Sequence, residues 1–161
     1  MPRTVPCLWF DGQAEAAAAH YVSIFPNSEV TSVQRAPADT PSGPAGYVMV
    51  VEFTLDGQPY TGLNGGPQFT FSEAVSFQVM CEDQAEADHY WDRLSEGGEE
   101  GPCGWLKDRF GLSWQVVPKE AVALMADADP ERARRATEAM LGMTRLDVAA
   151  MRAAADGAPV G

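Results

Sequence analysis

The tetrapeptide Gln-Ala-Glu-Ala occurs twice in this chain, at residues 13–16 and again at 84–87. Each copy follows a run with the pattern of a strand and opens a run with the pattern of a helix. A His-Tyr pair lies at residues 20–21 and again at 89–90, inside the two predicted helices. Because the repeated residues share a strand–turn–helix setting, they indicate an internal duplication. We therefore expect two modules, each with the element order β-α-β-β-β.

The first module is predicted to span about residues 3–67. Its helix is expected at 13–25, and its strands at 4–10, 29–36, 47–55 and 59–64. The third of these strands has the clearest alternation, since one face carries Tyr47, Met49, Val51, Phe53 and Leu55. Asp56-Gly57 follows directly and predicts a tight hairpin turn. The proline-rich segment 37–44 is expected to be a mobile surface loop.

The second module is predicted at about residues 74–118, with a strand at 75–81, a helix at 84–94 and a hairpin at 104–118. The hairpin turn is expected at residues 108–111. Its second strand places Leu112, Trp114 and Val116 on one face and Ser113, Gln115 and Val117 on the other. The more polar face has two interpretations, either the lining of a ligand pocket or an ordinary face in water.

The remaining residues, about 119–155, form a predicted helical tail. Helices are expected at 120–126, from Asp129-Pro130 to about residue 143, and from a cap at Asp147 through residue 154. The apolar residues of this tail need a partner, either their own sheet or a neighbouring subunit. The whole chain is thus predicted to be one α+β domain, residues 1–161, in which two βαβββ modules precede C-terminal helices.

Charge and cysteine content limit the possible partners and the compartment. The chain has 161 residues with 23 acidic and 11 basic side chains, which gives a net charge of −12. Such a balance argues against nucleic acid or an anionic membrane as a partner. The sequence has no apolar run of membrane-spanning length, and its first residues lack the apolar core of a signal peptide. Three widely spaced cysteines fit free thiols, and we expect a cytoplasmic protein.

Motifs for familiar chemistries are absent from the sequence. It contains no Gly-x-Gly-x-x-Gly, no phosphate-binding loop and no Gly-x-Ser-x-Gly. His20 and His89 have no His or Cys at helical spacing to share a metal. Cys103 is either a buried structural thiol or a thiol activated by Lys107. The segment 107–109 is either a solvated turn or a site at which Lys107 anchors a ligand.

Several segments together resemble one known family. They are Pro-Cys-Leu-Trp-Phe-Asp-Gly-Gln-Ala-Glu-Ala at 6–16, Leu-Asn-Gly-Gly-Pro at 63–67, Ser-Phe-Gln-Val at 76–79 and Gly-Trp-Leu-Lys-Asp-Arg-Phe-Gly-Leu-Ser-Trp-Gln at 104–115. The chain resembles PhnB-like proteins of the vicinal oxygen chelate superfamily, which has the glyoxalase and bleomycin-resistance fold, over roughly residues 3–155. The resemblance implies paired βαβββ modules whose sheets curl into a cup, in a homodimer. Some proteins of this family are named 3-demethylubiquinone 3-methyltransferases.

The resemblance also implies positions for a metal site and for a ligand site. The metal-ligand positions of the superfamily match Thr4, Asn64, Ser76 and Gln115, which offer only hydroxyl and amide groups. Because imidazole and carboxylate donors are missing there, we expect no bound metal and no other cofactor. The predicted function is binding of a small molecule by Trp9, Asn64, Gln78, Trp105 and Gln115. In the opposing interpretation, these amides bond one another and close the cup. A metal-dependent lyase, isomerase or dioxygenase is the first alternative function, and methyl transfer to a quinone-like phenol is the second.

Overall fold

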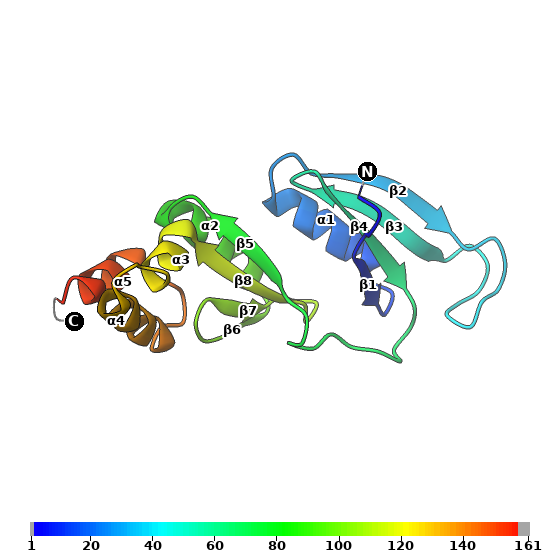
Figure 1. Cartoon of the computed structure of the whole chain (residues 1–161). Coiled ribbons are helices and arrows are strands. Elements are labelled where there is room, and N and C mark those ends of the chain that lie inside the picture. The colour runs from blue at the N-terminus through cyan, green and yellow to red at the C-terminus, as the bar shows by residue number, and fades with distance from the viewer. Residues whose placement is uncertain (1, 158–161) are drawn as a thin grey trace. The chain divides into compact units, whose positions relative to one another are not determined.

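A computed structural model describes residues 2–157 of the chain. The predicted order of elements is confirmed, with two βαβββ series followed by three helices (Figure 1). The first series is β1 (Cys7–Phe10), α1 (Ala14–Ile24), β2 (Glu29–Arg35), β3 (Val48–Leu55) and β4 (Gln58–Asn64). The second is β5 (Phe77–Cys81), α2 (Gln84–Ser95), β6 (Glu99–Glu100), β7 (Trp105–Lys107) and β8 (Ser113–Pro118). The tail forms α3 (Lys119–Met125), α4 (Pro130–Leu141) and α5 (Val148–Ala155).

The chain forms two compact units, Met1–Phe71 and Ser72–Gly161, which we call unit 1 and unit 2. Unit 1 has a four-stranded sheet in the order β1-β4-β3-β2, and unit 2 has one in the order β5-β8-β7-β6. In each sheet the first two strands are parallel and the other pairs are antiparallel. The two units therefore share one topology, as an internal duplication requires, and the α+β fold class is confirmed.

In unit 1, one face of the sheet packs against α1. Val51, Phe53 and Leu55 of β3 are buried, as their alternation predicted. The facing stripe of α1 consists of Ala14, Ala17, Ala18, Tyr21 and Ile24. Its small alanines let the helix lie close to the sheet, and removing this apolar surface from water stabilises the unit. At the predicted Asp56-Gly57 turn both residues have positive φ, 48° and 80°, as a tight hairpin requires.

In unit 2, the predicted hairpin is formed by β7 and β8. Gly111 has a φ of 85°, which lets the chain turn between the two strands. Leu106, Trp114 and Val116 are buried on the side of the sheet that packs against α2. The expectation of a solvated turn is wrong for Asp108, whose side chain is only 3% exposed. Its carboxylate accepts hydrogen bonds from the Phe110 and Leu112 backbone amides and the Trp114 indole, because this turn needs an internal acceptor.

The helical tail packs within unit 2. Its core consists of Ala121, Leu124, Ala136, Leu146, Met151 and Ala155, with Met125, Met140 and Met143 partly buried against them. The tail thus finds its apolar partners largely within its own chain. Asp129 and Asp147 cap α4 and α5 as predicted, each accepting a hydrogen bond from a backbone amide of the first helical turn.

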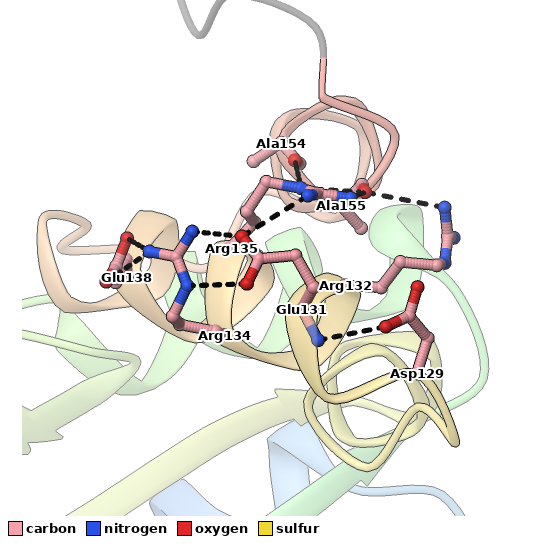
Figure 2. Close-up of polar contacts among 8 residues, drawn as sticks. All are labelled: Asp129, Glu131, Arg132, Arg134, Arg135, Glu138, Ala154 and Ala155. Carbon is pink, nitrogen blue, oxygen red and sulfur yellow. Dashed lines mark hydrogen bonds and ion pairs between the residues drawn. The ribbon is translucent and has the colours of Figure 1, made fainter.

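Arginines of α4 also bind the carboxyl end of α5, as Figure 2 shows. Arg135 donates to the Ala154 carbonyl at 3.1 Å and to the Ala155 carbonyl at 2.6 Å. The last carbonyls of a helix have no partner within it, so a guanidinium placed there stabilises the helix end. No helix among residues 2–157 is long and apolar enough to cross a membrane.

Candidate functional site

The face of the unit 2 sheet that turns away from α2 carries most of the polar side chains predicted for the site. Lys107 pairs with Ser113, and Trp105 pairs with Gln115. Gln115 also pairs with Gln78 on the other side of β8. Since directly paired residues project from the same face of a sheet, these side chains share one surface. The predicted separation of Ser113 and Gln115 from Trp114 is therefore confirmed.

A cavity of about 490 Å³ opens on this surface, and we call it the unit 2 cavity. It lies beside β6 and β7, and its wall includes the loop that joins them. The lining residues are Glu73, Glu99, Glu100, Gly101, Pro102, Cys103, Trp105, Leu106, Lys107 and Ser113. A cavity of this size suits a small organic molecule.

Charged groups of the cavity are mostly carboxylates. Three glutamates line it against one lysine, which leaves an excess of two negative charges. Lys107 forms an ion pair with Glu73, and its partner across the β6–β7 pairing is Glu99. The hydrogen bond and charge of Lys107 lower the pKa of Glu73, and Glu73 in turn raises the pKa of Lys107. Both groups therefore remain charged at neutral pH.

Glu100 has a different partner, the indole of Trp91 on α2. The indole nitrogen donates to Glu100 Oε1 at 2.9 Å. Trp91 itself is almost fully buried at 1% exposure, so the strand that carries Glu99 and Glu100 is tied to the core of unit 2. Glu73, Glu99 and Glu100 were not among the residues predicted for the site. The one local signal is that Glu99 and Glu100 directly follow Gly97-Gly98, after the end of the predicted helix 84–94.

Ser113 is the polar group of the cavity wall that the fold itself leaves unsatisfied. Its side chain is 1% exposed. Its Oγ has no hydrogen-bond partner among residues 2–157. A buried hydroxyl without a partner costs free energy, so such groups are rare in folded proteins. This position therefore favours a ligand that supplies the missing hydrogen bond.

Cys103 lies at the rim of the cavity, in an unusual backbone conformation. Its φ is +59°, although it is not a glycine, and Gly104 follows at +82°. Carbonyls of the tail hold both residues, since Cys103 N donates to Met143 O at 2.8 Å and Gly104 N donates to Thr144 O at 2.7 Å. The thiol is neither fully buried nor fully exposed. Its activation by Lys107 stays a prediction.

The other predicted ligand residues divide between the two units. Trp105 lines the unit 2 cavity, whereas Gln78 and Gln115 lie on the same face without lining it. Gln115 Nε2 donates to Ser76 Oγ at 2.9 Å. This contact joins two polar groups of the same face. It agrees with the alternative interpretation, in which the polar groups bond one another and do not bind a ligand.

Trp9 lies in unit 1, where it packs on the loop after β4. Its indole nitrogen donates to the Gly66 carbonyl at 2.8 Å, and its ring meets Phe69 edge-on at 4.9 Å. A Cβ at Gly65 would lie 2.3 Å from the Trp9 ring, so only glycine fits beneath this indole. The Asn-Gly-Gly-Pro segment thus has a structural role, because the indole of Trp9 packs against it.

Asn64 also lies in unit 1, and the structure places it differently from the expected cup lining. It pairs with Phe10, whose side chain is buried on the α1 side of the sheet. Asn64 Oδ1 accepts from the Ala14 backbone amide at 2.9 Å, and Nδ2 donates to the Val48 carbonyl at 2.8 Å. Asn64 is only 5% exposed and both of its amide atoms are bonded, so it holds the start of α1 and does not line a ligand site.

The residues at the metal-ligand positions do not fit a transition metal. Thr4 is exposed ahead of β1, Asn64 uses both amide atoms within unit 1, and Ser76 and Gln115 bond each other. Neutral hydroxyls and amides bind zinc, nickel or iron weakly. Within residues 2–157, no three His, Cys, Asp or Glu side chains are grouped so that they could hold one metal ion.

Two βαβββ units, each with a four-stranded mixed sheet, are the architecture of the glyoxalase type of α+β protein. Residues 2–117 match the family model described as 3-demethylubiquinone-9 3-methyltransferase. The chain belongs to this family, the PhnB-like branch of the vicinal oxygen chelate superfamily. The match ends before α3, so the helical tail lies outside it.

Several solved structures are similar to the chain, among them two with TM-scores above 0.6. One is a putative 3-demethylubiquinone-9 3-methyltransferase, PhnB protein, from Bacillus cereus, with 32% identity over 73% of this chain and 99% of that chain and a TM-score of 0.64. The other is protein PA1353 from Pseudomonas aeruginosa, with 19% identity over 73% of this chain and 98% of that chain and a TM-score of 0.61. A search of curated proteins gives no match.

Proposed function

We propose that the protein binds a small organic molecule in the unit 2 cavity, without a metal ion. The observation that carries this proposal is the pairing of a cavity of about 490 Å³ with the unsatisfied hydroxyl of Ser113 in its wall. Ligand sites are typically concave and mostly apolar, with a few polar groups that orient the ligand. The unit 2 cavity has this composition, since Trp105, Leu106 and Pro102 line it together with Ser113 and the charged groups.

A screen of a small-molecule library by thermal shift tests the proposal. We expect compounds that raise the melting temperature, because a ligand that binds only the folded state stabilises it. Their affinities are then measured by calorimetry with wild-type protein and the Trp105→Ala variant. Loss of this aromatic wall is expected to weaken binding roughly tenfold. A library without any stabilising compound would contradict the proposal.

Val122→Ala is the matched control for Trp105→Ala. Val122 lies on α3, is 42% exposed and does not line the cavity. Its truncation removes apolar surface from the same unit, so ligand affinity should stay at the wild-type value. Equal loss of affinity in both variants would place the ligand elsewhere in the protein.

Methyl transfer is the alternative that the description of the family supports. It requires S-adenosylmethionine, so calorimetry with this compound distinguishes methyl transfer from simple binding. A metal-dependent lyase, isomerase or dioxygenase needs donors that the matched positions do not provide. Ligand contacts by Trp9, Gln78 and Gln115, a homodimer and a cytoplasmic location all stay predictions.

A further inference from the structure

We infer that the unit 2 cavity selects a small primary ammonium compound with an aromatic or apolar body. This inference rests on the proposed function and names the class of ligand. Three features of the cavity carry it, namely the excess of carboxylates, the indole of Trp105 and the buried hydroxyl of Ser113. Each of them recognises a different part of such a compound.

The carboxylates decide the sign of the charge. Lys107 is the one cation of the lining, and Glu73 already pairs with it. Glu99 lies directly opposite Lys107 in the strand pairing and adds a second negative charge beside it. An anionic ligand would have to displace Glu73 from Lys107 and would still meet Glu99. The lining has two more carboxylates than ammonium groups, so its net charge attracts a cationic ligand.

Trp105 and Ser113 select the shape and the hydrogen bonding of the ligand. A cation over an indole face is attracted by the negative potential of the ring, and an apolar ligand body packs against the same surface. Ser113 Oγ, buried and without a partner among the described residues, can accept a hydrogen bond from an ammonium N–H. A quaternary ammonium has no N–H to donate, whereas a primary ammonium has three, enough for Ser113 and the neighbouring carboxylates together.

Three compounds of similar size and different charge test the inference. They are benzylamine, which is a cation at pH 7, neutral benzyl alcohol and anionic benzoate. Titrations followed by NMR report shifts of the Trp105 indole and of the Lys107 and Ser113 amides. We expect benzylamine to bind at least tenfold more tightly than benzyl alcohol, and benzoate to cause no saturable shift. Added salt should weaken the binding of benzylamine, because screening reduces the charge term.

A charge variant and a matched control assign the effect to the cavity. Glu99→Gln should weaken benzylamine binding several-fold and leave benzyl alcohol unchanged. Glu96→Gln removes the same charge from an exposed position close in sequence that does not line the cavity, so it should behave as wild type. An equal loss in both variants would show a general charge effect and overturn the inference.

The remaining outcomes are also decisive. Benzoate binding as tightly as benzylamine would overturn the inference, as would equal affinities for benzylamine and benzyl alcohol. If none of the three compounds shifts the resonances of the cavity, the inference is wrong as well. The proposed function is judged separately, since library compounds of any charge that need Trp105 would support it even when the preference for cations fails.

Discussion

At the scale of single residues, Ser113 and Ser76 form a natural comparison. Both are serines of the same sheet face, but Ser76 Oγ accepts a hydrogen bond from Gln115 and Ser113 Oγ has no partner within residues 2–157. Removing an unsatisfied buried hydroxyl relieves a cost, whereas removing a bonded one leaves the Gln115 amide without its acceptor. The two alanine variants should therefore change stability in opposite directions.

We expect Ser113→Ala to raise the free energy of unfolding by about 1 kcal/mol and Ser76→Ala to lower it by about 1 kcal/mol. Urea unfolding followed by tryptophan fluorescence measures both values. A loss of stability in Ser113→Ala as large as that in Ser76→Ala would show that the Ser113 hydroxyl has a partner in the free protein. In that case Ser113 would not need a ligand to supply a hydrogen bond.

Asn64 and Asp108 show where sequence reasoning fails at this scale. Asn64 was expected in the cup lining, but its pairing with Phe10 places it on the opposite face. That pairing joins two parallel strands far apart in the sequence, and a shift of one residue exchanges the two faces. Asp108 was expected in water, but its Oδ2 accepts a hydrogen bond from the Trp114 indole nitrogen at 2.8 Å. Neither the register nor this contact is encoded in a local pattern.

At the scale of elements, the helical tail reaches the site although it lies outside the family match. The segment between α4 and α5 accepts hydrogen bonds from Cys103 and Gly104 at the cavity rim. Gln84 on α2 fixes the same segment, since its side chain donates to Leu146 O and accepts from Val148 N, each at 2.9 Å. Gln84 therefore acts on the cavity rim through the tail.

Gln84→Ala should loosen this segment and expose Cys103. The loss of a hydrogen bond of about 1 kcal/mol predicts a rise of roughly fivefold in the rate at which Cys103 reacts with N-ethylmaleimide. Peptide mass spectrometry measures this rate in a Cys7→Ser background, because Cys7 is exposed. Cys81 should stay unlabelled, since burial raises its pKa to about 12. Gln58→Ala on the exposed end of β4 is the matched control, and an unchanged Cys103 rate in Gln84→Ala would contradict the role of Gln84.

The sequence predicted the elements much better than it predicted the site. The alternation in β3 and β8, the Asp56-Gly57 turn and the caps at Asp129 and Asp147 are local signals, and all of them are confirmed. The cavity depends on Glu73, β6 and Ser113, which meet only after the sheet has formed. Local patterns do not carry that information, so of the five predicted ligand residues only Trp105 lies in its wall.

At the scale of the whole molecule, both units carry the superfamily topology while the matched ligand positions lack its metal donors. Unit 1 uses Asn64 to hold the start of α1, and unit 2 uses Gln115 to bind Ser76. Two of the four positions that the resemblance implies for metal ligands, Asn64 and Gln115, thus make bonds within their own units. A protein built in this way should be stable without metal and indifferent to its addition.

We therefore expect protein purified without chelator to contain less than stoichiometric metal by elemental analysis, also after dialysis against Zn²⁺, Ni²⁺, Fe²⁺ or Mn²⁺. The melting temperature should be the same with and without each ion, because a ligand stabilises the folded state only by binding it. Retention of one equivalent together with a raised melting temperature would contradict this expectation. In that case Asn64→Ala and Gln115→Ala would show whether the matched positions hold the ion. If they do, the metal-dependent alternative would replace simple binding as the leading function.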